Sequence, residues 1–366
     1  MDDSAMHDTR ELRRLNRGYE RVLSSMCTYP HPAAVQAHID HIHTNLGDPN
    51  LFPEMAALER RAIAILGSFL GAADTVGYIT SGGTESNIQA VRASKLIFGA
   101  RKPNIVVPES AHQSFEKARE FTGVEVRQAR LDESYAVDIS SVEELVDENT
   151  ACVVGIAGST ALGVVDPIPA LARVARENDA VLHVDAAFGG FVLPFLEKKY
   201  RFDFRVEGVR SISVDPHKMG MSTIPSGGLL FKEPTDFDVL STNTFYSVER
   251  SITGTRSGAA VAATLAVLEH LGFDGYREIV RECMRLTNLC AERAAEFGVY
   301  PVVTPVMNIV AFKLPNLQRV ALRLTARGWR VSVMGGALRL VIMPHIDEAT
   351  ILQFVDDLRE IVKVDS

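Results

Sequence analysis

The chain has 366 residues, more than one hydrophobic core usually serves, so two domains are expected. Its 38 basic and 46 acidic residues give a formal charge of −8, and this dispersed acidic balance argues against a nucleic-acid-binding protein. There is no run of about 18 apolar residues that would predict a membrane partner, and the acidic stretch from Met1 to Asp8 is unlike a signal peptide. The four cysteines form no C-x-x-C pair, which is typical of buried thiols in a reducing compartment, so we expect a cytoplasmic protein.

Helices and strands are predicted to alternate along much of the chain. The first fifty residues look helical and then irregular around 29–32 and 46–49, and a helical period returns over 53–70. Short apolar runs predict strands at 105–107, 124–129, 152–157, 180–184, 211–214 and 228–231. Helices are predicted between them at 85–98, 114–121 and 167–178, the last one starting at Pro167 with Asp166 as its cap. This alternation predicts a mostly parallel sheet covered by helices on both faces.

The pattern changes towards the C-terminus. A helix of small apolar residues is predicted at 258–271, and mixed helices and strands follow, with strands at 309–312 and 338–342. We therefore predict an α/β protein with an N-terminal segment (1–50), a large domain (51–245) and a smaller C-terminal α+β domain (246–366).

The sequence Thr-Ser-Gly-Gly-Thr-Glu at 80–85 follows a predicted strand and opens a predicted helix. Glycines let the backbone approach an anion, and a helix start offers free N–H groups and a partial positive charge, so this segment can hold a phosphate. It lacks the P-loop lysine and the G-x-G-x-x-G spacing, which disfavours a nucleoside triphosphate and a dinucleotide. An ordinary tight turn before a capped helix is the alternative.

Two further polar signals follow strands. Asp185 ends an apolar strand, where an unpaired carboxylate is costly and a cationic partner such as a protonated pyridine nitrogen is expected; a structural salt bridge or a helix cap is the alternative. His183 lies two residues earlier on the same strand face, either supporting the site or satisfied within the core. Lys218 ends the segment Asp-Pro-His-Lys at 215–218, where it either forms an imine with a carbonyl cofactor or lies solvated on the surface.

Taken in this order, the three motifs resemble the group II pyridoxal-phosphate-dependent decarboxylases of fold type I, and most of all the archaeal L-tyrosine and L-aspartate decarboxylases. The likeness runs from 46–49 to 343–345 and is most specific at 81–85, 183–190 and 215–220. It implies pyridoxal 5'-phosphate as the cofactor, and L-tyrosine or L-aspartate as the small-molecule substrate. It also implies a homodimer with shared active sites and a role in methanofuran or coenzyme A biosynthesis.

The resemblance also assigns roles to individual residues. Lys218 carries the cofactor, Asp185 faces its pyridine nitrogen, and Gly83, Thr84 and His217 hold its phosphate region. Further cofactor contacts are implied for His112 and Ala187 on the two ring faces, Ser159 and Thr160 at the ring edge, and Thr255 and Arg256 at the phosphate of the other subunit. For the substrate, Arg339 is the implied anchor, and Tyr246 is the implied proton donor on a mobile loop.

Each of these roles has a simpler alternative. His112 starts a helix, Ser159 and Thr160 cap a turn, Arg256 forms a surface salt bridge, Arg339 stabilises the fold, and Tyr246 packs at the domain junction.

Other chemistries on the same scaffold compete with decarboxylation. A carbon–carbon lyase of the sphingosine-phosphate type and a cysteine desulfurase are the nearest, although no cysteine lies in an obvious glycine-rich loop. A non-catalytic relative that kept the fold is a third reading, which the intact Lys218 and Asp185 argue against. The spacing of His38, His41 and His43 matches no zinc signature, so we predict no metal site.

Overall fold

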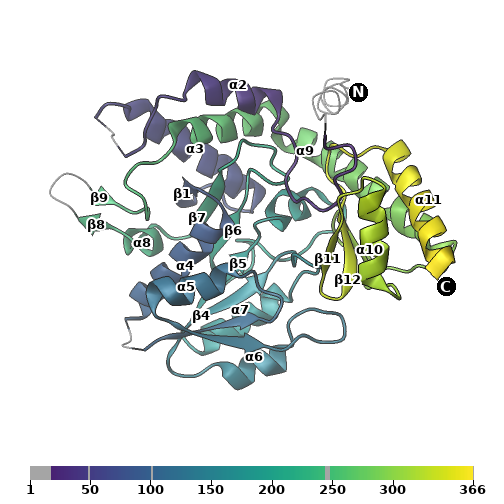
Figure 1. Cartoon of the computed structure of the whole chain (residues 1–366). Helices are drawn as coiled ribbons and strands as arrows, with labels where there is room; N and C mark the ends of the chain where they lie inside the picture. The colour runs from purple at the N-terminus through teal and green to yellow at the C-terminus, as the bar shows by residue number, and fades with distance from the viewer. Residues whose placement is uncertain (1–17, 48–49, 100–101, 244–247, 366) are drawn as a thin grey trace.

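A computed structural model describes residues 18–47, 50–99, 102–243 and 248–365. A large α/β layered body carries a smaller C-terminal body at one side, where α10, α11, β11 and β12 lie together (Figure 1). The helices are α2 (Pro32–Asp40), α3 (Pro53–Phe69), α4 (Gly83–Phe98), α5 (Ser114–Thr122), α6 (Ile139–Leu145), α7 (Ile168–Glu177), α8 (Pro234–Asp238), α9 (Gly258–Ala295), α10 (Leu317–Ala326) and α11 (Glu348–Asp365). Within the described residues, no helix combines the length and the apolar character needed to cross a membrane.

The central feature is a seven-stranded sheet in the order β1-β7-β6-β5-β4-β2-β3. Its strands are β1 (Val76–Thr80), β2 (Asn104–Pro108), β3 (Glu125–Ala129), β4 (Thr150–Ile156), β5 (Val181–Asp185), β6 (Val209–Val214) and β7 (Gly227–Phe231). The pairs from β6 across to β3 are parallel, whereas β7 runs antiparallel to both β6 and β1. The predicted mostly parallel α/β sheet is therefore confirmed, and each predicted strand lies within two residues of its observed bounds.

Both faces of this sheet are buried, which explains why its strands appear in the sequence as apolar runs rather than as alternating patterns. Ile105 and Val107 of β2 pack into one cluster with residues of α4 and α5. Val106 points to the opposite face and packs into the main cluster, which includes residues of α3, α7 and α9. The period of two along a strand thus divides each apolar run between two layers of helices.

The C-terminal body is built on a three-stranded antiparallel sheet in the order β10-β12-β11. Its strands are β10 (Ile309–Phe312), β11 (Ser332–Met334) and β12 (Ala337–Val341), and its core includes the buried Trp329 and Phe354. The long helix α9 joins the two bodies and is kinked at Gly272, whose φ of 56° is outside the helical range. Side chains up to Cys283 belong to the main core, and those from Leu286 onward belong to the C-terminal core, so the two cores divide within α9.

The N-terminal segment crosses between the bodies rather than standing apart. The Leu23 N–H donates to the Arg330 carbonyl at 2.8 Å, and the Leu23 carbonyl accepts from the Val341 N–H at 2.8 Å. This pairing attaches the residues before α2 to the C-terminal body.

One predicted local role is wrong. Asp166 was expected to cap the helix that begins near Pro167, but no side chain caps α7. The Asp166 carboxylate instead accepts the backbone N–H groups of Val137 and Ile156, each at 2.8 Å. Burial raises the pKa of Asp166 to about 6. Proximity along the chain suggested capping, but the tertiary fold offered two unpaired backbone donors nearby.

Candidate active site

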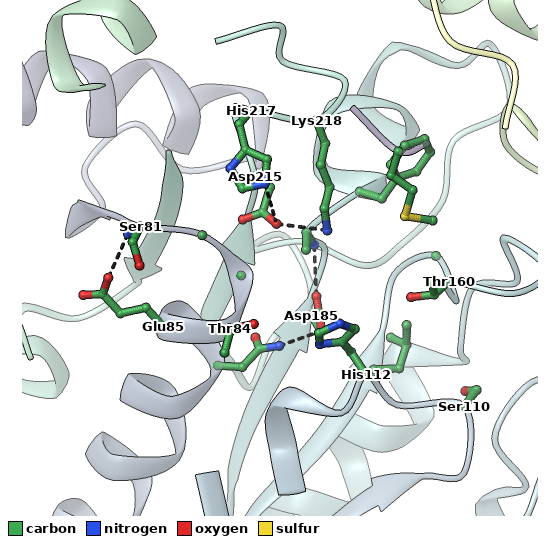
Figure 2. A pocket seen from close by; sticks show the side chains of 18 residues that line it. Ser81, Thr84, Glu85, Ser110, His112, Thr160, Asp185, Asp215, His217 and Lys218 are labelled. Atoms are coloured by element: carbon green, nitrogen blue, oxygen red, sulfur yellow. Dashed lines mark hydrogen bonds and ion pairs between the residues drawn. The ribbon is translucent and has the colours of Figure 1, made fainter. Parts of the chain in front are cut away.

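The carboxyl ends of five strands meet at one edge of the large sheet, and a cavity of about 270 Å³ lies there. Residues that follow β1, β2, β4, β5 and β6 line it, so segments far apart in the sequence share one wall. Open parallel sheets bind ligands at this position. Figure 2 shows Ser81 and Thr84 on one side of the cavity, Ser110 and Thr160 on the other, and Lys218 extending between them towards Asp185.

The first wall is the start of α4, where Gly82 has a φ of 146° that other residues rarely adopt. No side chain of the described residues caps this helix, so its first N–H groups are left for another partner, and Gly83 and Thr84 of its first turn line the cavity. Glu85 reaches back and accepts the Ser81 N–H at 2.8 Å, which fixes the turn. A Cβ added at Gly83 would lie 2.9 Å from the Asp215 carboxylate and 3.2 Å from Ala187, so only glycine leaves the space open.

His217 borders the same end of the cavity. Its Nδ1 accepts the Ser226 N–H at 3.2 Å, and burial lowers its pKa. A neutral imidazole that accepts at Nδ1 carries its proton at Nε2, so His217 offers one donor. Its ring lies beside Gly82, because a Cβ added there would be 3.1 Å from the imidazole Cε1.

Lys218 and Asp215 form a close ion pair, with 3.0 Å between Nζ and the carboxylate Oδ2. Burial alone would lower the pKa of Lys218, but the carboxylates of Asp215 and Asp185 outweigh it, so the pKa is raised. The other carboxylate oxygen of Asp215 is buried and has no hydrogen-bond partner among the described residues. An orphaned buried oxygen beside a buried amine is typical of a site built for a further polar group.

Asp185 lies at the end of β5 and is almost completely buried. Its Oδ1 accepts the Ala187 N–H at 3.0 Å and the Ser213 hydroxyl at 3.3 Å, and its Oδ2 accepts the Asn87 side-chain amide at 2.8 Å. None of these partners is a cation, so the alternative of a structural salt bridge does not hold for Asp185 within the described residues.

His112, Ala187 and Thr160 also line the cavity. The ring of His112 borders the cavity, and its Nδ1 also accepts the Ser114 N–H at 3.2 Å at the start of α5. Burial lowers the pKa of His112, against an opposing effect of Asp185. Ser159 does not line the cavity, because its hydroxyl caps a turn by accepting the Val164 N–H at 3.1 Å.

Comparison with known proteins decides what this cavity belongs to. Residues 22–315 match the pyridoxal-dependent decarboxylase conserved domain. The chain belongs to this family. It is a pyridoxal-phosphate-dependent amino-acid decarboxylase, as the resemblance of its motifs implied.

The decarboxylase has similar relatives over nearly its whole length. It is 53% identical to the probable L-tyrosine/L-aspartate decarboxylase of Methanothrix thermoacetophila, over 96% of this chain and 94% of the relative. It is 45% identical to the probable L-aspartate decarboxylase of Archaeoglobus fulgidus, over 98% and 99%. Among solved structures, a sphingosine-1-phosphate lyase of Burkholderia pseudomallei matches with a TM-score of 0.88 and 27% identity, over 99% of this chain and 90% of that one. The fold type I scaffold is therefore confirmed.

The cavity of the decarboxylase fits pyridoxal 5'-phosphate. The uncapped start of α4, with Gly83 and Thr84, suits a phosphate, and the His217 Nε2–H adds a donor there. At the far end, the Asp185 carboxylate suits a protonated ring nitrogen. The Lys218 amine lies between these two ends. The donor set thus matches a molecule that has a phosphate, a carbonyl and a basic ring nitrogen.

Besides Ser159, three predicted site residues lie outside this cavity. Arg339 of β12 is buried, and it donates to the Ser332 hydroxyl at 3.0 Å, the Thr160 carbonyl at 2.9 Å and the Ser24 carbonyl. Arg256 forms a bidentate ion pair with Glu59 and stacks over the Tyr78 ring, and Thr255 is exposed beside it. Tyr246 lies outside the described residues, so its proposed role as a proton donor stays a prediction.

Several residues of the cavity wall were not predicted from the sequence. Asp215 belongs to the motif at 215–218, but no role was predicted for it. Asn87 could have been found from its spacing, because it lies one helical turn after Gly83. Met26 comes from the N-terminal segment, and nothing local points to it. Cys27 also differs from expectation: it is half-buried beside this site, whereas the other three cysteines are buried.

The three N-terminal histidines have separate contacts. His38 bonds the Thr223 hydroxyl at 2.9 Å, His41 bonds the Ala37 carbonyl at 3.0 Å, and His43 packs edge-on against Phe52. No group of three or more histidine, cysteine or acidic side chains suited to a metal occurs among the described residues.

Proposed function

We propose that this decarboxylase acts on L-tyrosine, L-aspartate or both, releasing tyramine or β-alanine, and that it works as a cytoplasmic homodimer. The observation that carries the proposal is the similarity to tyrosine and aspartate decarboxylases at 45–53% identity over nearly the whole chain. Tyramine and β-alanine would be consistent with roles in methanofuran and coenzyme A biosynthesis. A carbon–carbon lyase activity has the same fold in its favour, but only at 27% identity.

Each residue of the cavity has a separate role in this reaction. When bound, pyridoxal 5'-phosphate supplies the electron sink that allows the α-carboxylate to leave as carbon dioxide. Lys218 holds the cofactor covalently, and Asp215 keeps the Lys218 side chain aimed into the cavity. Asp185 keeps a positive charge on the ring nitrogen. His112 and Ala187, which both line the cavity, would confine the ring, and the orientation of the bound substrate would select which of its bonds breaks.

Arg339 is proposed to attract the substrate's carboxylate. Its three acceptors are neutral carbonyl and hydroxyl oxygens, no acidic side chain pairs with it among the described residues, and burial lowers its pKa. A buried guanidinium without an anion favours binding of one nearby. Thr160 lines the cavity, and the guanidinium donates to its carbonyl, so Arg339 lies directly behind the cavity wall. The simpler role, which the same contacts support, is to join the N-terminal segment to the loop after β4.

A homodimer is supported by apolar exposure on one side of the large body. Ile39, Ile42 and Leu51, around α2 and the segment after it, are exposed by 58%, 70% and 65%, and Ile252 is exposed by 49%. The segments that carry Leu51 and Ile252 come together, because Gly47 is in close contact with the Gly254 carbonyl. Such a concentration of exposed apolar residues favours a protein interface. The proposed approach of Thr255 and Arg256 to the other subunit's phosphate requires Arg256 to leave Glu59.

The test is a substrate screen on the cofactor-loaded protein. Each of the twenty amino acids is supplied separately, and the amine released is identified by mass. Release of tyramine, β-alanine or both supports the proposal, and release of neither, with another amino acid consumed, overturns it. Sedimentation of the active enzyme tests the dimer, which an active monomer would disprove.

A further inference from the structure

The structure contains a chain of buried hydrogen bonds that ends at Asp185. It starts at Ser211 of β6, passes through His183 of β5 and Asn87 of α4, and reaches the Asp185 carboxylate. All four side chains are buried. The three distances are 2.8 Å from Ser211 Oγ to His183 Nδ1, 3.1 Å from His183 Nε2 to Asn87 Oδ1, and 2.8 Å from Asn87 Nδ2 to Asp185 Oδ2.

Strand register explains how this chain is assembled. In the parallel pair of β5 and β6, His183 lies opposite Ser211 and Asp185 lies opposite Ser213. Residues two apart on a strand share a face, so both pairs point to the side covered by α4. That helix presents Gly83 and Thr84 at its first turn and Asn87 one turn later, on the same side. One helix therefore reaches both the phosphate end and the ring-nitrogen end of the cavity.

The direction of every bond in the chain follows from its last member. A carboxylate only accepts, so the Asn87 amide must turn its nitrogen to Asp185 and its oxygen to His183. An amide oxygen also only accepts, so the His183 proton is on Nε2. Burial lowers the pKa of His183 to about 4. The ring is therefore neutral, and its Nδ1 accepts the Ser211 hydroxyl proton.

We propose that Asn87 and His183 are positioning residues for the cofactor's ring nitrogen: through this one-way chain they hold the Asp185 carboxylate in the orientation that keeps the ring nitrogen protonated. The inference rests on the decarboxylase assignment and goes beyond it. Asn87 is the critical link, because Ala187 and Ser213 both bond Oδ1, and among the described residues only Asn87 bonds Oδ2. Ser114 anchors Asn87 from the other side, since its Oγ accepts the same amide at 2.9 Å. Consecutive bonds that point the same way strengthen one another in a dry interior.

The experiment compares Asn87→Leu with the wild-type enzyme, both loaded with pyridoxal 5'-phosphate labelled with ¹⁵N at the ring nitrogen. The NMR shift of that nitrogen reports its protonation directly, independently of turnover. We expect a protonated nitrogen in the wild type and a shift towards the unprotonated value in the variant. We also expect kcat to fall on the order of 10- to 100-fold, the effect of losing one hydrogen bond to a charged group.

Asn104→Leu is the matched control. Asn104 is equally buried, donates its amide to the Asp147 carboxylate at 2.7 Å and accepts from the Thr150 hydroxyl at 2.8 Å, but it lies on β2 away from the cavity wall. It should leave the nitrogen shift and kcat unchanged. A wild-type nitrogen shift in Asn87→Leu would overturn the inference, even if that variant is less stable.

A second pair of variants keeps the inference testable if Asn87→Leu does not fold. His183→Gln retains an N–H that can reach Asn87, whereas His183→Leu retains none. We expect the first to resemble the wild type and the second to move the nitrogen signal; wild-type signals in both would overturn the inference. Failure of the wild type itself to bind the labelled cofactor would overturn the decarboxylase assignment as well.

Discussion

Replacing Asp185 by asparagine should separate the chemistry of this site from its folding. The introduced amide has the shape of the carboxylate, and its oxygen can still accept from the Ala187 N–H and the Ser213 hydroxyl. Its nitrogen would then face the Asn87 side-chain nitrogen. Both atoms are donors, whereas in the wild type the Asn87 nitrogen donates to a carboxylate oxygen 2.8 Å away. The Asn87 amide can relieve this by flipping, provided that His183 moves its proton to Nδ1 and donates to Ser211, and that the Ser114 hydroxyl, which now accepts from the Asn87 amide, turns to donate to its oxygen.

The folded variant can therefore keep these hydrogen bonds, with the donor and acceptor exchanged in each bond from Ser211 to residue 185. Since no bond is lost, we expect Asp185→Asn to change the free energy of unfolding by less than about 1 kcal/mol, which corresponds to about 1 °C in melting temperature for a chain of this length. The reaction has no such compensation, because an amide cannot neutralise a charged ring nitrogen. Loss of one electrostatic stabiliser of this kind costs about 3 kcal/mol, or on the order of 10²- to 10³-fold in kcat.

The assay measures kcat by the amine released from the best substrate of the screen, alongside melting temperature with and without cofactor. We expect a stable variant that still binds cofactor and is nearly inactive. A kcat within a few-fold of the wild-type value would refute it and make Asp185 a structural residue. A collapse in melting temperature would refute the compensation by Asn87 and His183.

Three further changes test other parts of the site. Lys218→Ala should abolish turnover and leave no cofactor attached after borohydride reduction, and a reduced adduct in this variant would place the cofactor on another lysine. Lys199→Ala is the control and should behave as wild type, because Lys199 is exposed and bonds the nearby Pro194 and Leu196 carbonyls. Arg339→Met should raise KM at least about tenfold if its charge attracts the substrate, while Arg339→Lys should raise it less; equal losses of melting temperature with an unchanged KM would leave it a purely structural residue. Glu59→Gln should loosen Arg256 and leave the dimer intact in sedimentation, because the contacts of Glu59 with Arg256 and with the Ile79 N–H lie within one chain. Dissociation into monomers would show that this ion pair shapes the interface.

The sequence by itself determined the architecture and the approximate place of the site. Strands buried on both faces have to be apolar throughout, so they were visible as short runs, and their regular alternation with helices implied a parallel sheet. Parallel strands all end at one edge. Motifs that follow different strands, such as 80–85 and 215–218, could therefore be placed in one cavity without any knowledge of contacts. The chemistry of glycine, aspartate and lysine at those ends then indicated the cofactor.

Only the tertiary structure decided which side chains support that site. Asn87 and Asp185 are 98 positions apart in the chain, Arg339 and Thr160 are 179 apart, and Arg339 and Ser24 are 315 apart. Patterns of three or four residues describe one helix or one strand, and they carry no information about which elements become neighbours. For the same reason, the sequence left open whether Arg339 anchors the substrate or stabilises the fold, and its contacts with the Thr160 and Ser24 carbonyls became visible only in the fold. Buried polar groups take whichever partners packing brings near them, and packing is a property of the whole chain.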